Sequence, residues 1–248
     1  MRKTLFTAPL LLMLLIAVLP VLITGAEPPI LAKKYERIVF VHYTKPSDPG
    51  KPQRPPVDNT AYKLIGPKWS ALAISYVIDP DGAPNGAVDE IKLAFETWDK
   101  VTTAELFNDE VTADPTAKPS LDAPDFRNVV CWRGIAPTSN VAMTVLWYED
   151  KDGSGSPTVG DETIDTDIIF NALLKWGIDP DDEGPIKIKA YDVQNVATHE
   201  AGHVIGLGDL AGDIHRELTM YAYTAKGETI KISLQTGDVT GCQVLYGA

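Results

Sequence analysis

The sequence predicts an α/β fold in which a twisted, mostly parallel sheet is backed by two long helices. Apolar segments of strand length alternate with turn residues and helical patterns between residues 71 and 171. Within residues 87–106, apolar side chains recur at three- and four-residue steps, as they do on the buried face of a helix. A second helix is expected at residues 191–207, before a glycine-rich turn.

The first elements upstream of the long helices are extended. Residues 37–43, Arg-Ile-Val-Phe-Val-His-Tyr, predict a strand, and the Pro-, Lys- and Asp-rich residues 45–58 predict a linker after it. Residues 71–78 are the next strand candidate, which Asp-Pro-Asp-Gly ends. After the first helix, further strands are expected at residues 128–132, 142–148 and 166–171.

The pattern H-E-x-x-H lies in the second predicted helix, for which Asp192 is the candidate N-cap. His199 and His203 would lie one turn apart on the same face, so both imidazoles can reach a single cation. Glu200 would stand beside that cation, in position to take a proton from water rather than to bind the metal. This spacing predicts a zinc-hydrolase site.

A third metal ligand is expected after a bend in the chain. Gly206 and Gly208 allow the bend, and Asp209 would then swing back and complete a three-ligand zinc site with one open position. Other residues compete for the third place or lie too far upstream to be assigned: His215 with its neighbour Asp213, Glu217 and Glu228 of a thermolysin-like alternative, and His42.

Three sequence motifs, in the order in which metzincin zinc peptidases carry them, resemble that family. They are the longer motif H-E-x-x-H-x-x-G-x-x-D, a methionine turn at residues 217–223, and residues 234–247, which are similar to the C-terminal helix of matrixin-like members. Aspartate as third ligand resembles a smaller branch, and the likeness is closest to matrixin-like peptidases of archaeal type over roughly residues 68–248. The resemblance implies a five-stranded sheet with an antiparallel edge strand and a small C-terminal subdomain that ends in a helix.

The same resemblance suggests roles around the cleft. Residues 166–171 resemble the antiparallel edge strand, whose open edge would pair with an extended peptide. Met220 would be structural. Matrixins usually carry a proline near Tyr223, which instead resembles the tyrosine of astacin-like members that ligates zinc or steadies the oxyanion. An aromatic in the wall of the specificity pocket is the alternative role for Tyr223.

These residues predict a secreted zinc metalloendopeptidase that acts on peptide or protein substrates. His199, His203 and Asp209 would hold Zn²⁺, while Glu200 acts as general base and returns its proton to the leaving amine. The alternative is a catalytically inactive, zinc-containing peptide-binding module, against which the open fourth position argues.

A second metal site is indicated at residues 150–161. Oxygen-bearing side chains at alternate positions, a glycine at the sixth and an acid at the twelfth resemble a calcium loop in outline. A plain Asp/Gly/Ser turn between strands would have a similar sequence. The candidate Ca²⁺ ligands are Asp150, Asp152, Ser154 and Asp161.

The N-terminal residues have the order of a secretory signal. Arg2 and Lys3 precede an apolar run at residues 10–23 and the small residues that end at Ala26, so residues 1–26 are expected to be removed on export. An uncleaved membrane anchor is the alternative. A strand and linker at residues 27–67 and a catalytic domain at residues 68–248 would follow.

The composition is acidic, with 22 Lys and Arg against 34 Asp and Glu. This balance disfavours nucleic acid and anionic membranes as partners, apart from the export step. The two cysteines, Cys131 and Cys242, would form one disulfide or serve as two buried small side chains. Neither lies in a Pro-Arg-Cys-Gly latency motif, which leaves open a short pro-segment of another kind.

Overall fold

The structure is a computed structural model that describes residues 34–46, 54–178 and 190–248. The predicted signal of residues 1–26 lies outside the described residues. The described residues form one compact unit, so the strand at residues 35–44 lies in the same unit as the predicted catalytic domain. Among the described residues, no helix is both long enough and apolar enough to span a bilayer.

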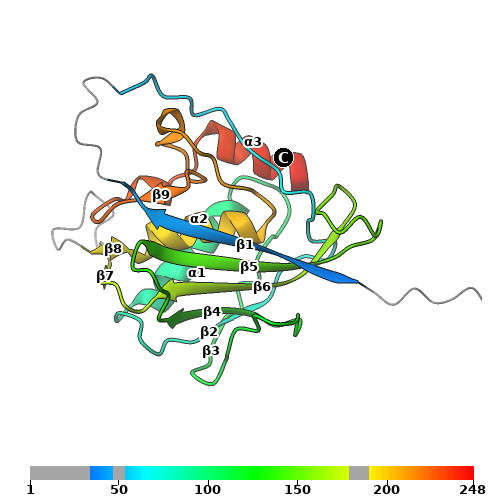
Figure 1. Cartoon of the computed structure of the whole chain (residues 1–248), viewed down its shortest axis with the longest axis horizontal. Helices are drawn as coiled ribbons and strands as arrows, with labels where there is room; N and C mark the ends of the chain where they lie inside the picture. Colours follow the sequence, from blue (N-terminus) through cyan, green and yellow to red (C-terminus); the bar gives the residue numbers. More distant parts are fainter. Residues whose placement is uncertain (1–33, 47–53, 179–189) are drawn as a thin grey trace, which may run out of the picture. The chain divides into compact units, whose positions relative to one another are not determined.

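A seven-stranded sheet forms the central layer, with the order β3-β2-β4-β6-β5-β1-β9 (Figure 1). The strands β3, β2, β4 and β6 run parallel, β5 is antiparallel to both of its neighbours, and β9 is parallel to β1. The strand bounds are β1 Tyr35–Thr44, β2 Tyr76–Ile78, β3 Thr112–Ala113, β4 Asn128–Arg133, β5 Asn140–Glu149, β6 Glu162–Asn171 and β9 Tyr223–Thr224; β7 Trp176–Gly177 and β8 Tyr191–Asp192 form a separate pair.

The helices are α1 (Ala87–Asp99), α2 (Val193–Val204) and α3 (Thr236–Tyr246). The face predicted to be apolar in α1 is buried through Ile91, Phe95 and Trp98, and the Trp98 indole donates a hydrogen bond of 2.9 Å to the Thr198 carbonyl of α2. Every residue of α2 is buried. The H-E-x-x-H motif therefore lies on a helix that is packed against other parts of the protein on every face.

Several element boundaries differ from the sequence-based expectation. The helix α1 ends at Asp99 rather than near residue 106, because the Asp99 carboxylate accepts the main-chain N–H groups of Leu106 and Phe107 and turns the chain back. Of residues 71–78, only Tyr76–Ile78 form a strand, although Ile74 makes an isolated bridge to Phe107. The expected α/β architecture is confirmed, with seven strands in place of five.

The predicted position of the open edge strand is wrong. Residues 166–171 belong to β6, which pairs with β4 on one side and with β5 on the other. The antiparallel strand is β5, whose outer edge is covered by β1. The sequence of β6 contains alternating polar residues, but their carboxylates are buried rather than exposed, since Asp165 and Asp167 accept main-chain N–H groups from the loop before β4.

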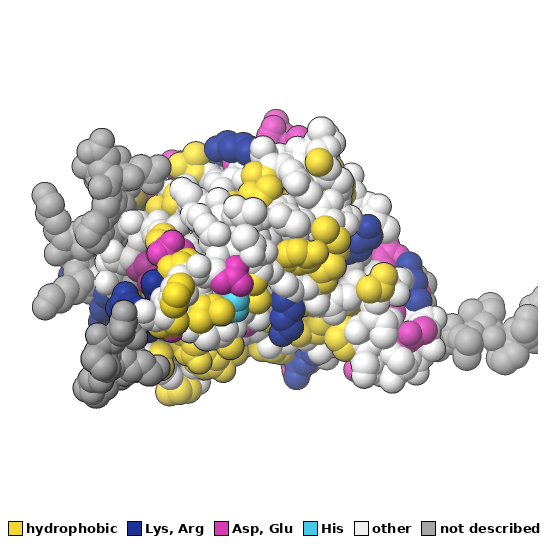
Figure 2. Space-filling model, turned by 90° about the horizontal axis from the view of Figure 1, so that it is seen from above, with side chains coloured by type: hydrophobic (Ala, Val, Ile, Leu, Met, Phe, Trp, Pro, Cys, Tyr) yellow, Lys and Arg dark blue, Asp and Glu magenta, His cyan; other side chains and the backbone are white. Residues whose placement is uncertain are grey.

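The cysteines are free and lie in different apolar clusters. Cys131 packs with Val129 and Trp147 on one face of the sheet, whereas Cys242 belongs to the larger core between sheet and helices. Of the two alternatives, buried small side chains describe them. On the face that Figure 2 shows, acidic and basic side chains are interspersed among apolar ones, without a patch of a single sign.

A cluster of acids at the end of α1 predicts a pH-dependent stability. Burial and then a hydrogen bond with Asp109 raise the pKa of Glu96 to about 7. The folded state thus holds a proton that the unfolded state releases near 4.5, so this contribution is complete below 4.5 and is lost as pH rises through 7.

We expect Glu96→Gln to match the wild type in urea unfolding at pH 5 and to be more stable by about 1 kcal/mol at pH 8.5, after allowance for solvent screening. The exposed neighbour Glu110 supplies the control, because Glu110→Gln should give equal differences at both pH values. If the stability of Glu96→Gln depended on pH as that of the wild type does, protonation of Glu96 would contribute nothing to folding.

Candidate metal centre

Two histidines of α2 direct one ring nitrogen each toward a common point. Asp192 caps α2 as predicted, accepting the Asn195 N–H at 2.7 Å, and this fixes where the helix begins. The Nδ1 atoms of His199 and His203 donate to the main-chain carbonyls of Thr219 at 2.7 Å and Leu207 at 2.8 Å. A carbonyl accepts only, so each Nε2 is left with its lone pair free for a metal.

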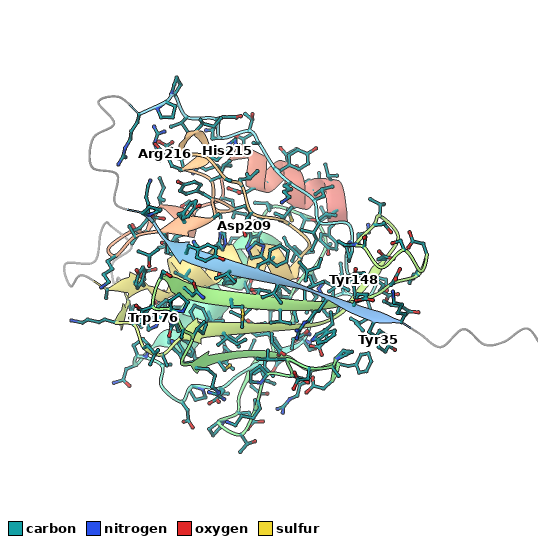
Figure 3. All side chains as sticks on the ribbon, in the orientation of Figure 1. Tyr35, Tyr148, Trp176, Asp209, His215 and Arg216 are labelled. Carbon is teal, nitrogen blue, oxygen red and sulfur yellow. The ribbon has the colours of Figure 1, made fainter. Side chains whose placement is uncertain are left out.

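Asp209 returns to these histidines, as the sequence predicted. Gly206 follows α2 with φ of +104°, and a Cβ at this position would lie 3.0 Å from the Pro67 carbonyl oxygen, so glycine suits the bend. The Asp209 Oδ1 atom lies 3.3 Å from His199 Nε2 and 3.5 Å from His203 Nε2 (Figure 3 labels Asp209 beside α2).

These three side chains fit a zinc ion. The atoms His199 Nε2, His203 Nε2 and Asp209 Oδ1 are buried without a hydrogen-bond partner. Tetrahedral zinc with bonds of about 2.0–2.1 Å sets its ligand atoms about 3.3 Å apart, which matches both separations of Asp209 Oδ1 from the imidazole nitrogens. Burial opposes charge on Asp209, but the two imidazoles hold the pKa of its carboxyl far below the usual range. An ionised carboxylate and two imidazoles are a typical donor set for Zn²⁺.

Glu200 lies beside this cluster and is not part of it. Its Oε2 accepts a hydrogen bond of 2.6 Å from the Thr144 hydroxyl on β5, whereas its Oε1 is buried without a partner. Burial raises the pKa of Glu200, while His199, His203 and Thr144 oppose that shift. One oxygen is thus held in place and the other is free to handle a proton.

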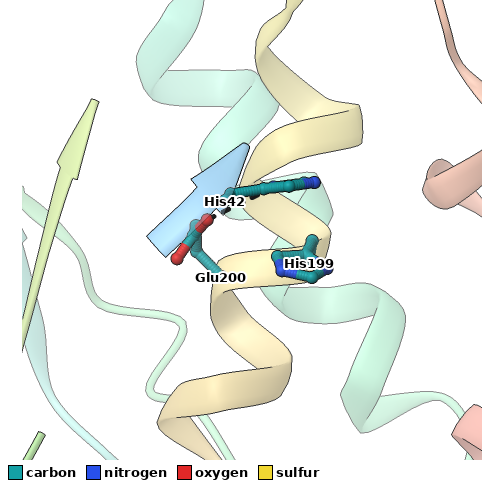
Figure 4. Close-up of side chains that lie close together, drawn as sticks. All are labelled: His42, His199 and Glu200. Carbon is teal, nitrogen blue, oxygen red and sulfur yellow. Dashed lines mark ion pairs between the residues drawn. The ribbon is translucent and has the colours of Figure 1, made fainter. Parts of the chain in front are cut away.

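His42 is a site residue that sequence reasoning missed. It lies on β1, is fully buried, and stacks on His199 with ring centroids 3.7 Å apart. Its Nδ1 lies 3.4 Å from Glu200 Oε1 (Figure 4). Alternation along residues 37–43 puts Phe40 and His42 on one face, but nothing in that pattern indicates which element the face covers.

The chain beneath the histidines is the predicted methionine turn. Met220 is buried and packs against Gly202 in the last turn of α2. The Asp238 carboxylate of α3 accepts the N–H groups of Thr219 at 2.9 Å and Met220 at 3.2 Å. Since the Thr219 carbonyl orients His199, Asp238 connects the C-terminal helix to the chain segment beneath the candidate metal centre.

Known proteins resemble this chain in the segments that carry the candidate site. A model of the Matrixin family of peptidases matches residues 149–247, which include α2, the methionine turn and α3. Three Arabidopsis thaliana proteins are similar: Metalloendoproteinase 1-MMP is 28% identical over 188 residues, 2-MMP 26% over 197, and 4-MMP 40% over 72. The first two matches cover 73% of this chain, which spans 45% and 43% of those relatives, and the third covers 29% of this chain and 19% of the relative.

These matches support a matrixin-type metzincin. The three relatives are named metalloendoproteinases, and the chain spans less than half of the length of each. The mixed, mostly parallel sheet with a C-terminal helix is consistent with the fold of a matrixin-type protein.

The other candidate ligands lie elsewhere. His215 Nδ1 donates to the Asp58 carbonyl at 3.4 Å, Asp213 pairs with Lys45, and Glu228 pairs with Lys231. In the part of the chain that the structure describes, none of these acids or His215 joins the three-residue group of His199, His203 and Asp209.

Tyr223 lies on β9 beside β1. Its ring centroid is 6.4 Å from that of Tyr43 and 5.5 Å from that of Tyr221. Tyr223 is level with Tyr43 in the parallel pairing, so its side chain lies on the face of β1 that Tyr43 occupies. A catalytic role for Tyr223 stays a prediction.

The loop predicted to bind calcium brings its carboxylates together. Ligand atoms of Asp150, Asp152 and Asp161 lie within 4.8 Å of one another, and Asp150 and Asp161 are buried. These oxygens accept N–H groups of the loop itself, including those of Ser154 and Gly155, and Lys34 pairs with Asp150 at 3.2 Å. Both a turn held by Asp side chains and a cation site are compatible with this geometry.

Proposed function

We propose that this chain is a secreted zinc-dependent endopeptidase of matrixin type, in the branch of archaeal type whose third zinc ligand is aspartate. The observation that carries the proposal is the convergence of three buried, unpartnered ligand atoms, from His199, His203 and Asp209, beside Glu200. Secretion rests on the residue order of segment 1–26 alone, and the N-terminal sequence of protein recovered from the medium would test it.

The chemistry divides between the metal and the protein. Zinc bound by the three ligands supplies Lewis acidity toward the water and the substrate carbonyl. Thr144 holds Glu200 Oε2, so that Oε1 accepts the proton of the attacking water and later donates it to the leaving amine. Tyr223 is proposed as an added hydrogen-bond donor to the oxyanion, because a phenol hydroxyl can donate such a bond.

A calcium ion bound by Asp150, Asp152, Ser154 and Asp161 is part of the proposal. Support comes from the gathering of three carboxylates, two of them buried, in one loop. Metal analysis of the purified protein, dialysed against calcium and zinc, tests both sites at once. One zinc without calcium would reject the calcium site only.

Asp209→Ala should lower zinc affinity by at least about a hundredfold, because loss of a direct ligand costs more than loss of the groups that support one. Competition with a chromophoric chelator measures the affinity. The control is Asp213→Ala, an acid of the same loop that pairs with Lys45 and should leave zinc binding unchanged. Equal affinity in Asp209→Ala and the wild type would contradict the assigned ligand set.

A further inference from the structure

Strand β1 crosses the front of the metal centre. It pairs antiparallel with β5 from Tyr35–Glu149 to Tyr43–Asn140, and its last two residues pair in parallel with Tyr223 and Thr224 of β9. In Figure 1, β1 is the blue strand drawn over α2. The strand therefore bridges the two segments that border the face of α2 carrying His199 and His203.

Two aromatic side chains of β1 cover the proposed zinc ligands. Phe40 stacks on His203 with centroids 4.0 Å apart and an interplanar angle of 10°, and His42 stacks on His199 at 3.7 Å and 29°. With this strand in place, His199, Glu200 and His203 have no exposed surface. A peptide carbonyl has no path to Glu200 Oε1, because the His42 ring occupies the adjoining space at 3.4 Å.

Little of β1 is buried against the site. Of the ten residues of β1, His42 is the single buried one, and Val39 and Tyr43 are 44% and 42% exposed. Both ring nitrogens of His42 and Glu200 Oε1 are buried without a hydrogen-bond partner in the structure. Buried polar atoms without partners cost free energy, so this end of the strand is docked less favourably than an ordinary core strand.

The geometry points to β1 as an intramolecular inhibitory strand, which occupies the site of an extended peptide along β5 and blocks Glu200 with His42. This inference rests on the proposed peptidase function. An extended substrate would bind by adding a strand to the outer edge of β5, and β1 already uses the main-chain groups of that edge from residue 140 to residue 149. Catalysis then requires that β1 leave its place.

The inference specifies the binding mode of the substrate. Because β1 runs antiparallel to β5, a peptide that replaces it would run in the same direction and would place alternate side chains toward α2. The inward positions of β1 hold Phe40 and His42, so the strand itself is a template for a ligand of this groove.

The test uses single substitutions in the full chain. Phe40→Ala and His42→Ala each remove one ring that covers a zinc ligand, and Val39→Ala truncates the neighbouring, outward-facing side chain as a matched control. Hydrogen exchange of residues 140–149 reports whether β1 still covers β5, and the protection of β4 and β6 in the same sample reports that the core is folded. Cleavage of an unfolded protein is measured on the zinc-loaded samples.

We expect Phe40→Ala and His42→Ala each to speed exchange at residues 140–149 and cleavage by about tenfold or more, as loss of a stacked aromatic contact predicts. Val39→Ala should stay within about twofold of the wild type in both measurements. A synthetic peptide with the sequence of residues 35–44 should inhibit Phe40→Ala in trans, and the same peptide carrying Phe40→Ala and His42→Ala should not.

Two results would contradict this inference, and they differ in what they imply for the peptidase assignment. If the wild type cleaves substrate as fast as Phe40→Ala and His42→Ala, the inhibitory role of β1 is overturned and the peptidase assignment stands. If exchange at residues 140–149 rises in these variants but no sample cleaves substrate, both the inhibitory role and the peptidase assignment are overturned.

Discussion

Replacing Glu200 by glutamine is expected to lower cleavage of an unfolded protein by about a thousandfold, within the range for loss of a general acid–base group. Glutamine has the same size, and its carbonyl oxygen can keep the hydrogen bond from Thr144, but it cannot take a proton from water. Zinc should remain bound, because Glu200 is not one of the three proposed ligands. The measurements are the cleavage rate and the zinc content of the same sample.

The comparison is best made in the Phe40→Ala background, where the uninhibited rate is expected to be higher. Glu96→Gln is a matched control, since it makes the same chemical change at an acid of α1 that is not a proposed site residue, and it should leave the rate unaltered. If Glu200→Gln cleaved the substrate as fast as the control variant, another group would have to transfer the proton.

Gly202→Ala is expected to destabilise the protein by about 3 kcal/mol, at the upper end of the usual cost of overpacking a core. A methyl group at this position would overlap Met220 Sδ and lie 2.9 Å from Trp98 Cζ2. Helix propensity alone predicts the opposite sign, because alanine is about 1 kcal/mol better than glycine inside a helix. Thermal unfolding should show a melting temperature lower by about 10 °C.

The control for this substitution is Gly134→Ala, where the added methyl group would lie 3.5 Å from the flexible Leu173 side chain in ordinary contact. Its melting temperature should stay within about 2 °C of the wild type. If Gly202→Ala proved as stable as Gly134→Ala, Met220 would have to be free to move away from α2.

Local patterns in the sequence predicted the parts of the site that lie close together along the chain. The spacing of His199 and His203, the cap at Asp192 and the bend before Asp209 depend on helix geometry and on glycine, and all three recur in the structure. The hydrogen bonds from Thr219 and Met220 to Asp238 could not be predicted from local patterns, because the two segments meet only in the tertiary fold.

The neighbours of each strand were harder to predict for a physical reason. The residues of β1 alternate as those of many edge strands do, and periodicity identifies a face without identifying its partner. The pairing of β1 with β5 and the burial of His42 arise from contacts across more than 90 positions of sequence, as in Tyr43–Asn140. The strands β3 and β9 have two residues each, too few to leave a periodic signal.

Point substitutions at Thr219 or Leu207 should change the orientation of the His199 and His203 rings little. Each ring is held by a main-chain carbonyl, at Thr219 and at Leu207, and every residue type carries that same oxygen. Many metal-binding histidines instead depend on a supporting carboxylate that one codon change can delete. Selection experiments on this chain should therefore recover loss of function at the ligands and the base themselves, and rarely at the two positions that aim the rings.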